Sequence, residues 1–255
     1  MSNRAQRILE RVAQSMTTLQ AFRTLEEVGA AAARQVSQAS ADAIASRGRF
    51  VVAFSGGSLP ATLCPHLLHL GTIDFSKWWV VFADERCVPH SDPESNFGLL
   101  QKHFLSRLPV PIPVEQVIAL NENAIGENPE AAAVAYERDL VAAFGHDFRI
   151  DVVLLGMGPD GHVASLFPGH RLLDCRDRRV ASISDSPKPP PARITLTLEA
   201  LNASRHVMFI VSGKSKREAM RSIQGECCQL PAALVRPTSG NLTWLCDAEA
   251  DPRNA

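Results

Sequence analysis

Four continuous apolar runs of strand length, separated by segments with helical periodicity, constrain the fold of this chain more than any other feature of its sequence. Short runs of this kind are typical of strands that are buried on both faces of a parallel sheet. The apolar runs are residues 50–54, 78–83, 150–155 and 206–211. The segments with helical spacing are residues 24–46, 60–70, 129–144 and 214–224. This alternation predicts an α/β fold, with a mostly parallel, doubly wound, Rossmann-like sheet and helices on both of its faces.

The chain is expected to form a single domain. A length of 255 residues suits one α/β domain, and no internal repeat or second domain is visible. We therefore assign residues 1–255 to this domain, with residues 1–20 and 248–255 as peripheral segments. The six cysteines are scattered without the spacing of metal ligands, so we expect reduced thiols and no metal site.

Charge and hydropathy exclude several classes of partner. The formal net charge of -1 supplies no basic excess for holding nucleic acid, so a bound anion must meet a local cluster of cations. No apolar stretch is long enough to span a bilayer, and the amino terminus lacks the apolar core of a signal peptide. We expect no membrane partner and a cytoplasmic location. Arg4, Arg7 and Arg11 leave an organelle transit peptide open as the alternative.

Glycine-rich or charged motifs follow each of the four apolar runs directly. They occupy residues 55–58, 84–86, 156–162 and 212–214. Ligands of open α/β sheets bind outside the carboxyl ends of the strands. We therefore expect the four motifs to converge on one crevice if their strands are parallel neighbours.

The first two motifs suit an anion. Gly56, Gly57 and Ser58 precede a helix and could present backbone N–H groups to a negative charge, although a plain tight turn needs the same glycines. Asp84 and Arg86 stand where a neutral turn is usual, so Arg86 could bind phosphate or carboxylate with Asp84 or its neighbour Glu85 positioning it. A surface ion pair is the alternative. Downstream, Ser95 and Asn96 begin a helical stretch in which Ser95 could act only as an N-cap.

The third motif points to proton transfer. Two glycines, a proline and Asp160-Gly161 predict a compact loop that presents His162 at the end of a strand, where a neutral imidazole can accept a proton from water. Asp160 could orient the ring. Metal binding is less attractive, because His162 and His170 are eight residues apart without another ligand at useful spacing.

Two further cations could complete a binding site for an anion. Arg193 begins a strand at residues 194–198, and Lys214 begins the last predicted helix. Each alone reads as an ordinary surface cation, but together with Arg86 they supply local positive charge. Residues 174–192, which precede Arg193, are charged and then rich in proline, and we interpret this stretch as an extended solvated loop. A mobile loop over the site, to which residues 184–186 and Lys188 contribute, is the alternative.

These motifs, in this order, resemble those of the 6-phosphogluconolactonase family, within the superfamily that includes glucosamine-6-phosphate deaminases and ribose-5-phosphate isomerases. The resemblance covers nearly the whole chain. Its marks are residues 54–58, 84–89, 95–96, 156–162, 165–168, 184–191, 193–197 and 231–235. Val163, where the family commonly has Thr, and Phe97, where Tyr is common, depart from the pattern without removing a candidate catalytic group.

The resemblance implies hydrolysis of 6-phospho-D-glucono-1,5-lactone in the oxidative pentose phosphate pathway, with no metal or organic cofactor and with functional coupling to glucose-6-phosphate dehydrogenase. His162 would activate the water, with Asp160 beside it. The residues expected around the substrate and its phosphate are Gly56, Gly57, Ser58, Asp84, Arg86, Ser95, Asn96, Arg193 and Lys214.

Two other functions remain as alternatives. A deaminase or isomerase of the same superfamily would carry a carboxylate shortly after the histidine, whereas residues 163–168 read Val-Ala-Ser-Leu-Phe-Pro. A sugar-phosphate sensor that has lost catalysis would need an output module, and the segment before residue 50 is too short and too rich in alanine to suggest a DNA-binding unit.

Overall fold

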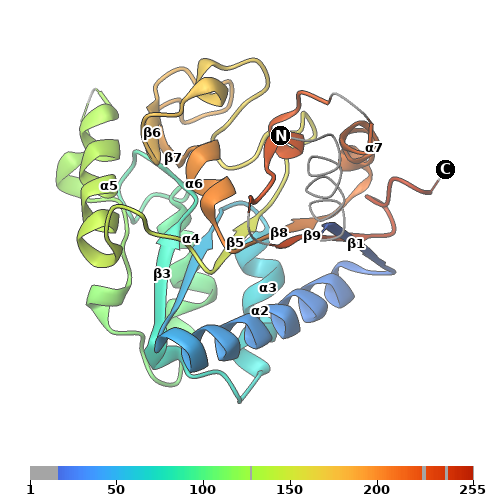
Figure 1. Cartoon of the computed structure of the whole chain (residues 1–255), viewed down its shortest axis with the longest axis horizontal. Coiled ribbons are helices and arrows are strands. Elements are labelled where there is room, and N and C mark those ends of the chain that lie inside the picture. The colour runs from blue at the N-terminus through green and yellow to red at the C-terminus, as the bar shows by residue number, and fades with distance from the viewer. Residues whose placement is uncertain (1–16, 127, 226–227, 239–240, 255) are drawn as a thin grey trace, which may run out of the picture.

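The computed structural model describes residues 17–126, 128–225, 228–238 and 241–254, and its main element is a six-stranded parallel sheet (Figure 1). The strand order is β1-β9-β8-β5-β2-β3. The strands are β1 (Thr17–Phe22), β2 (Phe50–Phe54), β3 (Trp78–Phe82), β5 (Val152–Leu155), β8 (His206–Val211) and β9 (Asn241–Asp247). The four apolar runs are thus the four neighbouring strands β8, β5, β2 and β3, and the predicted α/β sheet is confirmed.

Helices occupy the segments where the periodicity predicted them. They are α2 (Leu25–Arg47), α3 (Leu59–His69), α4 (Asn96–His103), α5 (Glu130–Phe144) and α7 (Arg217–Ile223). Two short helices, α6 (Leu198–Ala203) and α8 (Pro231–Leu234), were not predicted. The last predicted helix differs in its first turn, because a 3-10 helix, η6 (Lys214–Lys216), precedes α7. In Figure 1, α2 runs along the lower side of the sheet and α5 stands at the left.

A small antiparallel sheet extends the structure beyond β3. Its order is β4-β7-β6, with β4 (Asp84–Arg86), β7 (Arg193–Leu196) and β6 (Val180–Ile183). The chain passes from one sheet to the other at Ala83, whose N–H donates to Phe54 O at 2.8 Å and whose carbonyl accepts from Leu196 N at 2.7 Å. This switch places the charged motif after β3 next to β7, with Arg86 directly opposite Arg193.

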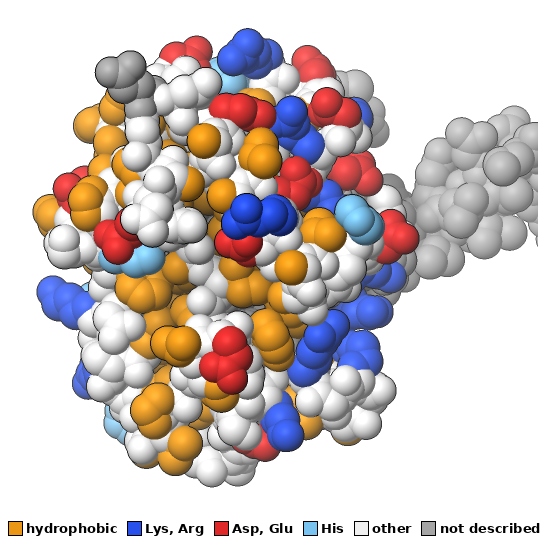
Figure 2. Space-filling model, turned by 90° about the vertical axis from the view of Figure 1, so that its left-hand side faces the viewer, with side chains coloured by type: hydrophobic (Ala, Val, Ile, Leu, Met, Phe, Trp, Pro, Cys, Tyr) orange, Lys and Arg blue, Asp and Glu red, His pale blue; other side chains and the backbone are white. Residues whose placement is uncertain are grey.

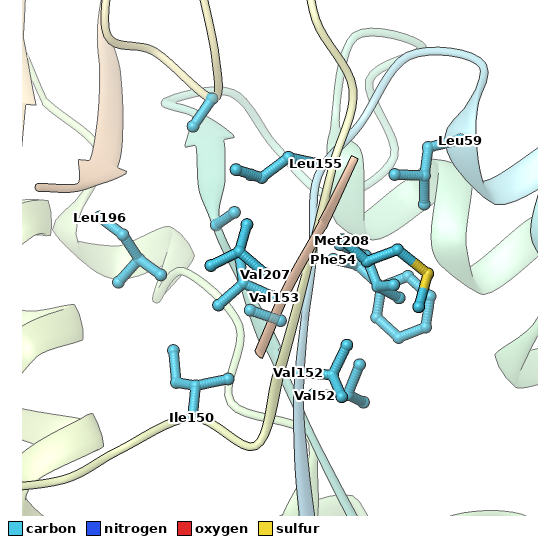
Figure 3. Close-up of a cluster of buried hydrophobic side chains, with 14 of the residues drawn as sticks. Val52, Phe54, Leu59, Ile150, Val152, Val153, Leu155, Leu196, Val207 and Met208 are labelled. Carbon is cyan, nitrogen blue, oxygen red and sulfur yellow. The ribbon is translucent and has the colours of Figure 1, made fainter. Parts of the chain in front are cut away.

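The core lies on both faces of the central strands, as continuous apolar runs require. Phe54 and Met208 pack on one face, toward Leu59 of α3, whereas Val207 lies on the opposite face, toward Leu196 of β7 (Figure 3). Each of these five side chains is at most 2% exposed. Burying both faces leaves only the ends of the strands available for a ligand.

The strand order also places a topological switch point between β2 and β5. From β2 the chain moves to β3 on one side, and it then crosses to β5 on the other. Connections that leave in opposite directions open a crevice at the carboxyl ends of the two strands. The loop after β2 and the histidine loop after β5 therefore border the same space.

Parts of the two segments that the sequence placed at the periphery belong to the packed structure. Residues 17–22 pair along β9 as the edge strand β1, and Ala250 is fully buried. Residues 1–16 lie outside the described residues.

The surface is mixed in charge on the face that carries α5, where acidic and basic side chains are interspersed (Figure 2). Among the helices of the described residues, none is both long and apolar enough to cross a membrane.

Candidate active site

The loops after β2, β3, β5 and β8 surround a cavity of about 240 Å³ at the carboxyl ends of the strands. It occupies the switch point between β2 and β5. The residues that the sequence predicted and that line it are Gly56, Gly57, Ser58, Asp84, Arg86, His162 and Arg193. The four motifs therefore converge on one crevice, as expected.

The glycine loop needs its glycines for two different reasons. A Cβ at Gly56 would lie 1.8 Å from the Asn96 Oδ1, so only glycine permits this close approach. Gly57 has a φ of 67°, which favours glycine. The loop then enters the eleven-residue helix α3, and Ser58 makes no side-chain capping bond. A helix amino terminus with free N–H groups facing a cavity favours an anion or a developing negative charge.

Asp84 joins three segments of the site. It is 4% exposed, and its Oδ1 accepts a hydrogen bond from Ser55 Oγ at 3.0 Å while its Oδ2 accepts from Ser165 Oγ at 2.9 Å. The Asn96 amide donates to the carbonyl oxygen of Asp84 at 2.8 Å. Asn96 does not itself line the cavity but contacts it indirectly, through its hydrogen bond to Asp84 and its close approach to Gly56.

Glu85 is the residue whose role the sequence analysis left open. It is 1% exposed and accepts from the backbone N–H groups of Asn96 and Phe97, each at 2.7 Å, and from Ser95 Oγ at 3.3 Å. It thereby accepts hydrogen bonds from the free N–H groups at the amino terminus of α4, where Ser95 is the N-cap. Burial raises the pKa of Glu85 to about 7. The sequence signal was a second carboxylate between Asp84 and Arg86, followed by a helix start ten residues later.

The histidine loop fixes the ring of His162. The His162 Nδ1 lies 2.5 Å from Asp160 Oδ1, and the ring stacks on Phe167 with 4.9 Å between centroids. A Cβ at Gly158 would lie 1.9 Å from the Nδ1, so glycine is required where the loop folds under the ring. An ionised Asp160 accepts a hydrogen bond from a proton held on Nδ1, which leaves the lone pair of the neutral ring on Nε2. Among the described residues, none forms a hydrogen bond with Nε2.

The environment of His162 favours the neutral ring. Burial lowers its pKa from the ordinary value of 6.5, and the hydrogen bond with Asp160 opposes this shift only in part. Burial is the largest influence on the pKa of Asp160 and raises it, but the hydrogen bonds and charge of His162, together with the charge of Lys188, outweigh burial and lower the pKa. The pair is therefore a neutral imidazole beside a carboxylate near pH 7, as a general base requires.

The two arginines differ in how much of their guanidinium is already used. Arg86 donates to the Glu94 carbonyl oxygen through Nη1, and its Nε is buried without a hydrogen-bond partner among the described residues. Arg193 is 3% exposed and donates to the carbonyl oxygens of Pro190, Pro189 and Lys188 at 2.9, 3.0 and 2.8 Å. Arg193 thus holds the proline-rich loop, whereas Arg86 keeps donor capacity at the cavity.

The lysines at the cavity are not the one that the sequence indicated. Lys188 and Lys216 line it, whereas Lys214 is exposed and is not among the lining residues. The 3-10 helix explains the difference, because side chains two positions apart on a helix with three residues per turn point in different directions. For Lys188 the structure favours a place over the site instead of in a solvated loop, because its ammonium lies 3.2 Å from the His162 Nδ1. The available signal was a lysine within the motif that leads to Arg193.

The cavity therefore combines a proton acceptor with four cations, Arg86, Lys188, Arg193 and Lys216. Among the described residues, no group of three or more His, Cys, Asp and Glu side chains is gathered as a metal site would need. Chemically, the arrangement suits a phosphate-bearing substrate that is attacked by water.

Comparisons with known proteins identify the family. The family model described as glucosamine-6-phosphate isomerases/6-phosphogluconolactonase matches residues 23–244. The chain is 45% identical to the 6-phosphogluconolactonase of Homo sapiens over 239 residues, which cover 90% of each protein. It is 39% identical to a probable chloroplastic 6-phosphogluconolactonase of Oryza sativa, covering 90% of this chain and 73% of the relative.

Solved structures share the fold. The 6-phosphogluconolactonase of Thermotoga maritima superposes with a TM-score of 0.79 at 27% identity, covering 91% of this chain and 99% of that one. The 6-phosphogluconolactonase of Trypanosoma brucei superposes with a TM-score of 0.80 at 25% identity, covering 92% of this chain and 97% of that one. A monomeric glucosamine-6-phosphate deaminase has the same fold, with a TM-score of 0.74 at 23% identity and coverage of 91% and 98%.

Proposed function

The chain belongs to the glucosamine-6-phosphate isomerase/6-phosphogluconolactonase family, and from this premise we propose that it hydrolyses 6-phospho-D-glucono-1,5-lactone with His162 as the base. It is an enzyme, a carboxylic ester hydrolase that acts on a sugar-phosphate lactone and yields 6-phospho-D-gluconate. The observation that carries the mechanism is the His162 Nδ1 held 2.5 Å from the Asp160 carboxylate inside a cavity lined by cations.

The reaction follows from this geometry. The His162 Nε2 takes a proton from water, and the oxygen of that water adds to the lactone carbonyl carbon. The bond from this carbon to the ring oxygen then breaks, and the imidazolium returns the proton to the departing oxygen. The backbone N–H groups of residues 56–58, at the start of α3, are our candidates for stabilising the negative charge on the carbonyl oxygen.

The cations bind the phosphate and so orient the lactone for attack. Arg86 and Lys216 are the best placed, because both line the cavity and Arg193 is committed to the proline-rich loop. Asp84 faces the same space with its carboxylate fixed by two serines and is our candidate for contacting a sugar hydroxyl. Three other predicted site residues lie outside the cavity lining and act through hydrogen bonds. Asp160 bonds to His162, Ser95 to Glu85 and Asn96 to Asp84.

The deaminase alternative lacks its carboxylate. Residues 163–168 contain none, and Val163, Ser165 and Leu166 are fully buried. The likeness to the solved deaminase shows the shared fold alone, given its 23% identity. The sensor alternative requires that the cavity binds a sugar phosphate without catalysing its hydrolysis. A measurement of activity decides between the sensor and the enzyme.

The deciding experiment generates the lactone in place with glucose-6-phosphate dehydrogenase and follows 6-phosphogluconate above the spontaneous rate of hydrolysis. Acceleration by the wild-type protein supports the lactonase. A folded wild-type protein that binds 6-phosphogluconate without accelerating hydrolysis would establish the sensor instead. We further propose a cytoplasmic location and functional coupling to the dehydrogenase, which supplies the unstable substrate.

The pH dependence of kcat/KM is expected to report His162. Because burial lowers its pKa below 6.5, kcat/KM should be flat between about pH 7 and 8 and fall about tenfold per unit below that pKa. The measurement is the initial rate of product formation from pH 4.5 to 8, corrected for spontaneous hydrolysis. An acid limb with its midpoint above pH 7 would contradict a buried His162 as the base.

Lys216→Met is expected to raise KM for the lactone about tenfold over the wild type, and Lys214→Met is expected to raise it less. Of these two lysines, Lys216 lines the cavity and Lys214 does not. The two lysines are two residues apart on η6, so the second variant is a matched control for loss of charge. Steady-state kinetics at one ionic strength gives both values. Equal increases in KM would mean that the phosphate lies beyond the cavity, within reach of both side chains.

A further inference from the structure

The proline-rich loop brings an ammonium group to the catalytic pair. Building on the proposed function, we propose that Lys188 is a positioning residue that keeps the His162 ring neutral, with its proton on Nδ1 and its lone pair on Nε2. The sequence gives no reason for a loop lysine to act on a histidine 26 residues earlier in the chain. The assignment comes from the contacts between them.

Two charged groups meet at the His162 Nδ1. The Asp160 Oδ1 lies 2.5 Å from it and the Lys188 Nζ lies 3.2 Å from it, while Nζ and Oδ1 are 3.6 Å apart. The carboxylate accepts a hydrogen bond and so requires a proton on Nδ1, whereas an ammonium could only donate to a bare Nδ1. The shorter contact is with the carboxylate, so the proton resides on Nδ1. Lys188 then acts through its charge, which opposes a second proton on the ring.

Hydrogen bonds fix the backbone of Lys188 in the proline-rich loop. Its carbonyl oxygen accepts from the Arg193 Nη2 and from the Ser186 Oγ, each at 2.8 Å, and its N–H donates to the same Ser186 oxygen at 3.2 Å. Arg193 lies 5.8 Å from the centroid of the Phe167 ring, on which His162 also stacks. The buried arginine thus ties the lysine loop to the histidine loop.

The charged groups around His162 come from four segments. Asp160 belongs to the same loop as His162, Lys188 to the proline-rich loop, Asp84 to β4, and Lys216 to η6. Arg86 and Arg193 line the same cavity. Burial lowers the pKa of His162, Asp160 raises it, Lys188 lowers it again, and Asp84 raises it. Of the nearby cations, Lys188 is the one in contact with the ring.

This role predicts a specific change when the charge is removed. Lys188→Met should raise the pKa of His162 by about one unit, a moderate shift because the lysine side chain is 38% exposed and partly screened by water. The acid limb of kcat/KM should move up by the same amount, so that activity falls about tenfold at pH values below the wild-type pKa of His162 and much less near pH 8. Lys188→Arg should keep the pKa within about 0.3 unit of wild type.

The test is a titration of the His162 ring nitrogens by 15N NMR in the wild type, Lys188→Met, Lys188→Gln and Lys188→Arg. Exposed Lys77, just before β3 at the opposite end of the sheet, supplies the control Lys77→Met. We expect the wild type to show the Nδ1–H form, the Met and Gln variants to share the upward shift, and the Arg and Lys77 variants to resemble the wild type.

The NMR result separates this inference from the proposed function. An unchanged pKa in both neutral variants, with kcat/KM lowered equally at all pH values, would overturn the inference and indicate that Lys188 only contacts substrate or supports the loop. A wild-type ring with its proton on Nε2 would also overturn it. A wild-type protein that fails to accelerate lactone hydrolysis would instead refute the proposed function, whatever the titration shows.

Discussion

Replacing His162 with alanine is expected to lower kcat/KM for the lactone by about 10³-fold, within the range for loss of a general base. KM should change little, because the cations that hold the phosphate remain in place. The effect is measured in the same assay as for the wild type, well above the spontaneous rate. Free imidazole added to the variant should restore part of the activity, because the missing ring leaves room beside Phe167.

The control for this substitution is His146→Ala. His146 is exposed just beyond the end of α5 and does not line the cavity. It should retain wild-type kinetics. If His162→Ala kept more than about a tenth of the wild-type kcat/KM, another group would have to be the base, because general-base contributions typically exceed that factor.

Gly158→Ala is expected to abolish most of the activity without unfolding the protein. The added Cβ would lie 1.9 Å from the His162 Nδ1 and 2.4 Å from the Asp160 Oδ1, both at the ends of side chains that can move away. The ring is then displaced from its carboxylate, and a misplacement of about 1 Å can cost about 10²-fold in rate. We expect a loss of at least that size in kcat/KM, with a thermal unfolding midpoint close to that of the wild type.

Gly156 provides the comparison within the same loop. A Cβ there would meet no atom within 4 Å, so Gly156→Ala should cause a far smaller loss of kcat/KM than Gly158→Ala. Kinetics and circular dichroism on both variants check this. Full activity in Gly158→Ala would show that the ring works from another position than the one stacked on Phe167.

Much of the fold could be predicted because its signals are local. The runs 50–54 and 206–211 became strands with the same bounds, since uninterrupted apolar sequence is stable only where both faces of a sheet are covered. The edge strand β1 and its neighbour β9 were not predicted. Their sequences, Thr-Thr-Leu-Gln-Ala-Phe and Asn-Leu-Thr-Trp-Leu-Cys-Asp, mix polar and apolar residues, and β1 has a neighbour on only one side.

The site likewise contains residues that a local signal predicted correctly and one that it did not. Predictions for Gly56, Asp84 and His162 relied on their place directly after a strand, and all three line the cavity. Lys214 was predicted from the same kind of position, yet it points elsewhere because a 3-10 turn replaces the start of the helix. Whether each of these side chains takes part in binding or catalysis stays a prediction.

By itself the sequence determined the α/β architecture, the end of the sheet that carries chemistry and the histidine proposed as the base, because periodicity and strand-end motifs are properties of neighbouring residues. Only the tertiary structure decided that Lys188 contacts His162, that Arg193 donates its hydrogen bonds to the proline-rich loop and that Glu85 accepts hydrogen bonds from the amino terminus of α4. Those outcomes depend on segments far apart in the chain and on the direction of single side chains, and no local pattern encodes either.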